Sequence, residues 1–406
     1  MERCRDGRGC RRVLVVLRWP VGGIRTYVRY NYPFLQEEGY RFTFLGPADG
    51  DFRAFAAELR GWEGAEFAEA PVRGKRCRLW LTARVQLRTG RFALVHSHGL
   101  IATAQAAAAN LALGVPHVAT IHDVFRPVHA AGWRGRVKVW ALGRLLRRVD
   151  AVAAVGEDVR ANLAAHVPGL EKDKRLVSIR NGIDTERFAE ASGVEAEPLR
   201  SRLALGNDVC LMGFLGRFME QKGFLPLLDA LSRLADRPTR PWHLVAVGSG
   251  DYEREYRQEA QRRGLSAKVT FLGFMPDVRP VLRQLDLLLM PSLWEACPLL
   301  PMEALAAGVP VLGSDCIGLR EVLRDTPSQM APAGDVDAWC NALERAVARP
   351  WAEAARDFAP EARRRFSVAP AAEQLRQVFD GVLAGRRTAR GRVRTADPAV
   401  PVGSGT

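Results

Sequence analysis

Two carboxylates and two cations stand at spacings that suit the binding of a sugar and a diphosphate. Glu295 and Glu303 share the stretch from Pro291 to Asp315, and Arg217 and Lys222 share an earlier one. A carboxylate accepts hydrogen bonds from vicinal hydroxyl groups, as a sugar or a ribose offers them. Two cations beside a helix N-terminus suit a diphosphate. The two glutamates also fit a glycosidase acid–base pair, although the two cations would then have no purpose.

Each of these groups is predicted to follow a buried strand. The apolar run 286–290 indicates a strand, a polar loop with Glu295 comes next, and a helix with Glu303 is predicted to end at Gly308. Similarly, a strand at 211–215 leads through Arg217 and Lys222 into a helix. Ligands of such sheets bind at the carboxyl ends of the strands, where these loops lie.

The first half of the chain places other candidates after predicted strands. Gly22 and Gly23 follow the strand at 13–17, and a glycine pair lets a phosphate or a sugar approach the backbone. His98 and His122 fall just past two later strands. One histidine there is compatible with a core residue that has a satisfied partner. Two histidines and a glycine pair at strand ends favour a binding site.

Strands and helices alternate through both halves, which predicts an α/β fold with doubly wound parallel sheets. A chain of 406 residues is long enough for two domains. We expect an N-terminal domain over 1–189, a linker over 190–207, a second domain over 208–358 and a basic, disordered tail over 384–406.

The net charge of +14 indicates a phosphate-bearing partner or simply an arginine-rich composition. Residues 73–91 carry seven cations and no acid, with Leu79, Trp80, Ala83 and Leu87 at helical spacing. This pattern predicts a basic amphipathic helix, which suits either an anionic membrane surface or a solvated face packed on the domain. A nucleic-acid partner is not expected, because no nucleic-acid motif is present.

The seven cysteines are odd in number and form no C-x-x-C pair, which favours a reducing, cytoplasmic compartment. No stretch approaches the roughly 20 apolar residues of a membrane span.

Metal and nucleotide cofactors are not expected. Two D-x-D patterns, at 49–51 and 335–337, are interpreted as a turn and a helix cap. The loop at Lys222 lacks the glycine spacing and hydroxyl residue of a Walker loop, and 248–250 lacks the dinucleotide fingerprint. Without a metal, Arg217 and Lys222 must neutralise a leaving diphosphate together with the helix dipole.

Taken in chain order, these motifs resemble the retaining glycosyltransferases of family four, which have the GT-B fold. The resemblance covers the chain from Val13 to about Phe379. It is carried by Gly216-Arg217-x4-Lys222-Gly223 and by the E-x7-E spacing of Glu295 and Glu303, with support from Gly22-Gly23, His122-Asp123 and Asn181-Gly-Ile-Asp184. After the glycine pair the family often has an acidic residue and an arginine, whereas Ile24-Arg25 stands here.

The resemblance implies two Rossmann-like domains facing a cleft, with a helix at 359–383 that crosses back to the first domain. It implies a nucleotide-sugar donor, held mainly by the second domain. Catalysis is assigned to Arg217, Lys222, Glu295 and His122. Substrate binding is assigned to Gly22, Gly23, His98, Asn181, Gly216, Phe274, Met275, Cys297, Pro298, Leu299, Leu300 and Glu303. Of these, Glu303 would hold the ribose, Phe274 and Met275 the base, and His122 would lie near the anomeric carbon.

The expected function is transfer of a hexose-type sugar, with retention and without a metal, to a glycan or lipid-linked acceptor of bacterial surface polysaccharide synthesis. No cofactor is expected beyond the nucleotide sugar as co-substrate. The expected location is the cytoplasm, at the inner face of the membrane if the segment 73–91 binds it. A nucleotide-sugar epimerase of the same architecture is the alternative, against which the Glu295 and Glu303 signature argues.

Overall fold

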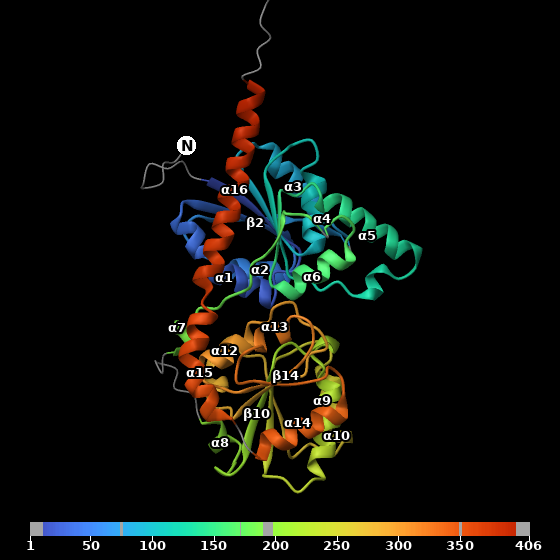
Figure 1. The fold of residues 1–406 in the computed structure, drawn as a ribbon, viewed down its shortest axis with the longest axis vertical. Coiled ribbons are helices and arrows are strands. Elements are labelled where there is room, and N and C mark those ends of the chain that lie inside the picture. Colours follow the sequence, from blue (N-terminus) through green and yellow to red (C-terminus); the bar gives the residue numbers. More distant parts are fainter. Residues whose placement is uncertain (1–10, 74–75, 171, 190–197, 349–350, 395–406) are drawn as a thin grey trace, which may run out of the picture.

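The computed structural model describes residues 11–73, 76–170, 172–189, 198–348 and 351–394. It consists of two sheets, one in each half of the chain, with helices on both faces (Figure 1). This architecture confirms the predicted α/β, doubly wound fold class. Residues 1–10 lie outside the described residues, and Arg11 begins the first strand.

The N-terminal sheet is parallel and has the strand order β3-β2-β1-β6-β7-β8-β9. Its strands are β1 (Arg11–Leu17), β2 (Tyr40–Pro47), β3 (Ala65–Ala70), β6 (Leu94–His98), β7 (His117–Ile121), β8 (Ala151–Ala154) and β9 (Leu176–Ser178). The chain reverses direction across the sheet between β1 and β6. The carboxyl ends of these two strands and of β7 therefore meet at one edge, which is where a ligand binds in such folds.

Helices cover both faces of this sheet because its interior strand β1 is apolar on both sides. Val13, Val15 and Leu17 pack against one layer, and Leu14 and Val16 pack against the other. The first layer contains α1 (Gly23–Glu37), α2 (Gly50–Glu58) and α16 (Val368–Arg394). The second contains α3 (Leu79–Arg88), α4 (Leu100–Ala109) and α5 (Gly132–Leu146), followed along the chain by α6 (Glu157–His166).

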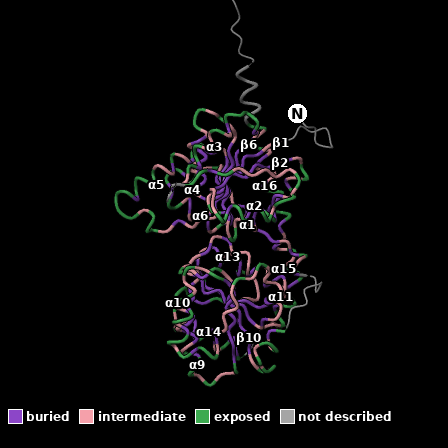
Figure 2. The backbone as a smooth tube through the Cα atoms, turned by 180° about the vertical axis from the view of Figure 1, so that it is seen from behind, coloured by how far each residue is buried: buried purple, intermediate pink, exposed green. Residues whose placement is uncertain are grey.

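The C-terminal sheet is also parallel, in the order β12-β11-β10-β13-β14-β15. Its strands are β10 (Cys210–Leu215), β11 (Trp242–Val247), β12 (Val269–Gly273), β13 (Leu287–Met290), β14 (Val311–Ser314) and β15 (Gln329–Ala331). Its helices are α9 (Phe224–Ala235), α10 (Glu253–Arg262), α11 (Arg279–Leu282), α12 (Leu300–Ala306), α13 (Leu319–Leu323), α14 (Val336–Ala348) and α15 (Ala352–Arg365). Figure 2 shows the buried strands at the centre of both halves.

The chain passes between the halves twice. Short helices α7 (Glu186–Ala189) and α8 (Leu199–Arg202) flank the first passage, and the buried Leu199 donates its N–H to Gln284 of the second half at 2.6 Å. At the second passage α15 packs on α12 and α16 packs on α1. Between those two helices Ser367 forms a parallel bridge with Ile183. The last helix thus returns to the N-terminal half, as the resemblance implies.

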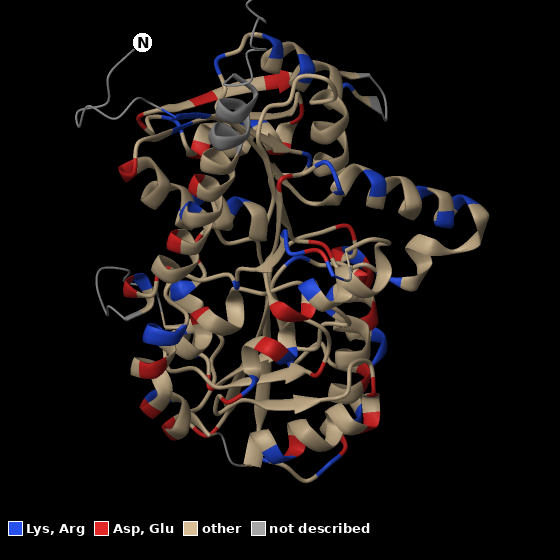
Figure 3. Ribbon diagram, turned by 45° about the horizontal axis from the view of Figure 1, so that its top comes forward, with Lys and Arg blue, Asp and Glu red and all other residues tan. Residues whose placement is uncertain are grey.

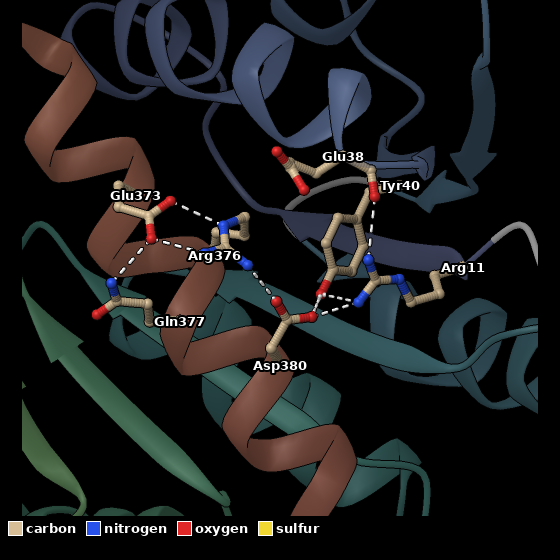
Figure 4. Close-up of polar contacts among 7 residues, drawn as sticks. All are labelled: Arg11, Glu38, Tyr40, Glu373, Arg376, Gln377 and Asp380. Atoms are coloured by element: carbon tan, nitrogen blue, oxygen red, sulfur yellow. Dashed lines mark hydrogen bonds and ion pairs between the residues drawn. The ribbon is translucent and has the colours of Figure 1, made fainter. Parts of the chain in front are cut away.

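A polar cluster fixes α16 to the N-terminal sheet (Figure 4). The Asp380 carboxylate accepts hydrogen bonds from the Tyr40 hydroxyl at 2.8 Å and from Arg376 at 2.6 Å, and it pairs with Arg11 of β1. Phe379 packs edge-on against the Tyr40 ring. These contacts hold the C-terminal end of the chain on the first half.

Two expectations about local structure are wrong. Residues 73–91 are not one helix, because β4 (Val72–Arg73) pairs with β5 (Arg76–Cys77) as a hairpin and only α3 is helical. The tail is not disordered from 384, because α16 continues to Arg394. Alanine and arginine are strong helix formers, so a run rich in both extends a helix that is already packed. The part of the tail at 395–406 lies outside the described residues.

Candidate active site

The carboxyl ends of two paired strands carry the two main motifs. β10 pairs with β13, and the loops that follow them contain Arg217 with Lys222 and Glu295 respectively. The chain reverses direction across the sheet between these strands, so their loops diverge and leave a crevice at this point. The predicted strand–loop–helix–strand unit is confirmed: Glu295 lies on the loop and Glu303 on α12, and Gly308 follows the helix with a φ of 75°.

The two motif loops approach each other so closely that only glycine fits between them. Gly223 begins α9 with a φ of 65°, and a Cβ atom there would lie 2.0 Å from the Pro291 carbonyl oxygen. A side chain at this position would both strain the backbone and collide with the facing loop. The Lys222–Gly223 pair thus brings a cation against the loop that carries Glu295.

Lys222 and Glu295 form an ion pair that the sequence did not predict. Lys222 Nζ lies 2.6 Å from Glu295 Oε1, and the Ser292 hydroxyl donates to the same oxygen at 2.7 Å. Gln221 donates to the Trp294 carbonyl at 2.8 Å, which holds the two loops together. The Glu295 side chain is 7% exposed, so its charge is balanced by a partner at close range. Arg217, by contrast, is exposed and has no ion pair among the described residues.

Glu303 lies at the boundary with the N-terminal half. Burial raises the pKa of its carboxyl group to about 7, against the opposing effect of Arg29 and Arg187 nearby. Its side chain accepts no hydrogen bond from the described residues, so both oxygens are available to a ligand's hydroxyl groups.

A cavity of about 510 Å³ lies between the two halves and brings most predicted residues together. All four residues assigned to catalysis line it: Arg217, Lys222, Glu295 and His122. Residues assigned to substrate binding that also line it are Gly22, Gly23, Asn181, Gly216, Cys297, Pro298, Leu299, Leu300 and Glu303. His98, Phe274 and Met275 are not among the lining residues.

His98 lies behind the cavity, in a buried chain of hydrogen bonds. Its Nδ1 lies 2.9 Å from His122 Nε2, and its Nε2 lies 2.7 Å from the Tyr32 hydroxyl oxygen. The same hydroxyl lies 2.6 Å from His96 Nδ1, and His96 Nε2 lies 2.8 Å from the Thr120 hydroxyl oxygen. His98 therefore positions the His122 ring instead of contacting a ligand.

Burial sets the charge state of the three histidines in this row of hydrogen bonds. It lowers the pKa of His122 to about 3, and it lowers the pKa values of His96 and His98 well below the usual range. All three imidazoles are neutral near pH 7. His122 thus presents an uncharged ring to the cavity, and the hydrogen bond between its Nε2 and His98 holds that ring in place.

The remaining predicted positions divide between the cavity wall and the surface. Phe274 follows β12 and is 69% exposed, whereas Met275 is half-buried and packs on the apolar core. Asn181 donates from Nδ2 to the Cys297 carbonyl at 3.0 Å, while its buried Oδ1 has no partner among the described residues. Asn181 thus ties the N-terminal half to the Glu295 loop.

Cys297 is buried, and burial raises the pKa of its thiol to about 12. A thiol that stays protonated is not a nucleophile, which agrees with its interpretation as a packing residue.

Both D-x-D motifs cap helices, which confirms the predicted cap at Asp335 and shows that Asp49, interpreted as a turn residue, caps α2. Asp49 Oδ1 accepts from the Phe52 N–H at 3.0 Å, and Asp335 Oδ1 accepts from the Ala338 N–H at 2.9 Å. Among the described residues no group of three or more His, Cys, Asp or Glu side chains has the arrangement of a metal site.

Comparison with known proteins assigns both halves to one family. Residues 21–187 match the family model described as Glycosyltransferase Family 4, and residues 210–349 match Glycosyl transferases group 1. Bacillus subtilis EpsF, named as a glycosyltransferase, is 30% identical over 338 residues, which are 80% of this chain and 85% of EpsF. The chain belongs to glycosyltransferase family 4.

Other relatives extend the comparison over most of the chain. The phosphatidyl-myo-inositol mannosyltransferase of Mycobacterium tuberculosis H37Rv is 28% identical over 398 residues, covering 89% of this chain and 93% of its own. The crystal structure of Anabaena HepE in complex with UDP and glucose superposes with a TM-score of 0.76 at 21% identity, covering 91% and 100% of the two chains. This likeness confirms the GT-B fold.

Sequence reasoning missed three groups of residues at this site. Ser292 and Gln221 each lie beside a predicted residue and could have been found by asking what holds the Glu295 carboxylate and its loop. Tyr32 and His96 lie within a helix and a strand and not in a loop after a strand end, so the search for site residues in such loops did not select them. Arg29 and Arg187 belong to the N-terminal half, so their approach to Glu303 depends on how the halves meet.

Proposed function

We propose that this glycosyltransferase moves a hexose from a nucleoside diphosphate sugar to a glycan or lipid-linked acceptor, with retention at the anomeric carbon and without a metal ion. The observation that carries the proposal is the single cavity in which Arg217, Lys222, Glu295 and Glu303 meet His122. Cations, hydroxyl-binding carboxylates and a neutral imidazole together match the parts of such a donor.

Each part of the donor has a partner in this proposal. The diphosphate lies at Arg217 and the N-terminus of α9, the ribose hydroxyls at Glu303, and the sugar beside Glu295. Phe274 and Met275 receive the base at the outer end. Lys222 stays bound to Glu295 and places its remaining donors toward the phosphate. The relatives transfer sugars in bacterial polysaccharide and glycolipid synthesis according to their names, which supports the same role here.

The reaction needs no side-chain nucleophile. The acceptor oxygen forms its bond to the anomeric carbon on the face from which the phosphate oxygen departs. The bonding electrons leave with the diphosphate, which takes the acceptor's proton. Charge that grows on the diphosphate is stabilised by Arg217, by Lys222 and by helix dipoles. The buried, protonated Cys297 thiol offers no competing nucleophile.

Location at the inner face of the cell membrane is part of the proposal. Among the described residues no helix has both the length and the apolar composition to cross a bilayer. Contact through the segment 73–91 stays a prediction. Leu79, Ala83 and Leu87 of α3 are buried in the N-terminal half, which leaves Trp80 as the exposed member of the predicted apolar face.

A donor screen followed by a transfer assay tests the proposal. We expect UDP-glucose, GDP-mannose or ADP-glucose to raise the melting temperature, because a ligand that binds only the folded state stabilises it. The stabilising donor, radiolabelled in its sugar, should label a lipid extract or a glycan, equally with and without EDTA. Nuclear magnetic resonance of the product should show the donor's anomeric configuration. Inversion, or loss of activity in EDTA, would contradict the mechanism.

The epimerase alternative receives no support from the relatives described above, which are transferases. Conversion of the donor to an epimer in the absence of any acceptor would be needed to revive it.

A further inference from the structure

Helix α5 projects from the side of the N-terminal half (Figures 1 and 3). It exposes large apolar side chains to solvent. Trp133, Val137 and Trp140 lie at i, i+4 and i+7, so they form one stripe along the helix. They are 65%, 54% and 57% exposed. We call these three residues the α5 stripe. It lies on the opposite side of the helix from the buried Val139 and Leu146.

The α5 stripe is flanked by cations. Arg134, Arg136, Lys138 and Arg144 lie on the same helix, and none has an ion pair with another described residue. The sequence contains no acidic residue from Val124 to Val149. Arg134 and Arg144 lie over the faces of the two tryptophan rings, each with its guanidinium carbon 5.3 Å from a ring centre. The basic groups therefore surround the apolar stripe at close range.

From these contacts we infer that α5 docks on the surface of an anionic lipid bilayer and inserts the α5 stripe at the level of the headgroups. Tryptophan favours this depth because its ring is apolar and its N–H is polar. Cations beside the stripe meet anionic headgroups, which a zwitterionic surface does not offer. The charge surrounding the stripe argues against a second copy of this chain, because two such surfaces would repel each other.

The position of α5 connects the α5 stripe to the proposed reaction. This part of the inference rests on the proposed function. Asp123 and His122 line the cavity, and the chain runs from them directly into the short helix η1 (Pro127–Ala130) and then α5. Gly135 of α5 packs on Ala130, so η1 and α5 form one rigid projection. A short segment thus connects α5 to the cavity wall that the N-terminal half contributes, and this connection suits a membrane-embedded, lipid-linked acceptor.

Vesicle flotation tests the docking. We expect the full chain to float with vesicles of 70% phosphatidylcholine and 30% phosphatidylglycerol, and to stay unbound with phosphatidylcholine alone. The triple variant Trp133→Ser, Val137→Ser, Trp140→Ser should bind roughly tenfold more weakly or worse. Raising the salt concentration should weaken binding of the wild type. Acyl chains that carry bromine should quench the wild-type tryptophan fluorescence more strongly than that of the triple variant.

Two controls make the result specific. Met330→Ser changes a side chain that is 45% exposed in the other half of the molecule, and it should bind vesicles as the wild type does. Trp80→Ser with Val85→Ser changes the two most exposed of the three exposed large apolar side chains of α3, and it should keep most of the binding. If the α3 variant loses binding and the α5 variant does not, the assignment to α5 is overturned.

The donor measurement separates this inference from the proposed function. The triple variant should keep the wild-type melting temperature and the shift caused by the stabilising nucleotide sugar, because no residue of the stripe lines the cavity. Failure of the wild type to float, with donor binding intact, would overturn the docking and leave the proposed function standing. A wild-type dimer that the triple variant converts to a monomer, without vesicle binding, would overturn it in favour of self-association.

Discussion

The two walls of the cavity are built from different chemistry. The C-terminal wall is charged: Arg217, Lys222, Glu295 and Glu303 follow or flank the strand ends of one sheet. The N-terminal wall presents a glycine pair, His122, whose imidazole is neutral because it is buried, and one carboxyl group, that of Asp123, which accepts the Leu100 N–H at 2.7 Å. A diphosphate sugar carries its charge before the reaction begins, so it needs the charged wall. An acceptor hydroxyl is neutral, and a fixed neutral imidazole suits it. The difference supports the proposal that the donor binds mainly to the C-terminal half and the acceptor to the N-terminal half.

Removal of Lys222 should give the largest effect, because it lowers both the catalytic efficiency and the stability of the folded protein. Lys222→Ala is expected to lower kcat/KM by roughly 10²–10³, as for the loss of a group that stabilises developing charge. It also leaves the Glu295 carboxylate buried beside Ser292 without its cation, which costs about 3 kcal/mol of unfolding free energy. Chemical denaturation and steady-state kinetics measure the two effects.

The double variant Lys222→Ala, Glu295→Gln is the matched control. It removes the unpaired charge and should recover part of the lost stability without recovering activity. Arg254→Ala, an exposed cation on α10, should change neither quantity. A single Lys222 variant that is as stable as the double variant would show that the ion pair is not what fixes these loops.

The His122→Ala variant tests the role of the N-terminal wall. We expect kcat to fall by roughly 10² while the donor KM changes less than about threefold, because the residue acts on the reacting centre and not on the diphosphate. Tyr32→Phe, which removes the hydroxyl between His96 and His98, should lower kcat by several-fold with the same small change in KM. A large rise in donor KM in either variant would contradict the assignment of donor binding to the C-terminal wall.

The pH dependence of donor binding tests Glu303. Its pKa of about 7 means that the group is protonated below pH 7 and ionised above it. Ribose hydroxyls donate hydrogen bonds, so they bind the carboxylate better than the acid. The donor Kd should therefore fall between pH 6 and pH 8, by about threefold to tenfold for one titrating group. Calorimetric titration measures it, and Glu303→Gln should bind weakly with no such pH dependence.

Removal of a contact between the two halves should have the smallest effect. Glu321 of α13 accepts the N–H groups of Glu157 and Asp158 at 3.0 and 2.8 Å, which caps the start of α6 in the other half. Glu321→Ala should cost about 1 kcal/mol and increase the radius of gyration measured by small-angle X-ray scattering. An unchanged radius would show that the remaining contacts, among them Asp158 with Arg320 and Gly318, hold the halves together without Glu321.

The residues that line both walls were largely predictable from the sequence, whereas the contacts that hold them were not. Arg217, Lys222, Glu295 and Glu303 lie in short loops or a helix directly after apolar runs, so local pattern was enough to place them at strand ends. The pairing of Lys222 with Glu295 joins residues far apart in the sequence and depends on β10 lying beside β13. Strand order is a property of the whole sheet, which local pattern does not determine.

His98 illustrates the limit more sharply. Its place at the end of β6 was nearly right, but its ring faces Tyr32 of α1 and not the cavity. Which way a residue at a strand end points depends on the helix that packs over it. The hairpin at 72–77 was missed because its strands are only two residues each, too short for an apolar period.

The most direct test of the division between the walls is the affinity of one donor for three variants. Isothermal titration with whichever of UDP-glucose, GDP-mannose or ADP-glucose stabilises the wild type should give a Kd at least about tenfold weaker for Arg217→Ala and for Glu303→Gln. The His122→Ala variant should bind the same donor with a Kd within about threefold of the wild-type value. It should nevertheless transfer the sugar much more slowly than the wild type does. Weak donor binding by His122→Ala, with normal binding by the other two variants, would contradict the account.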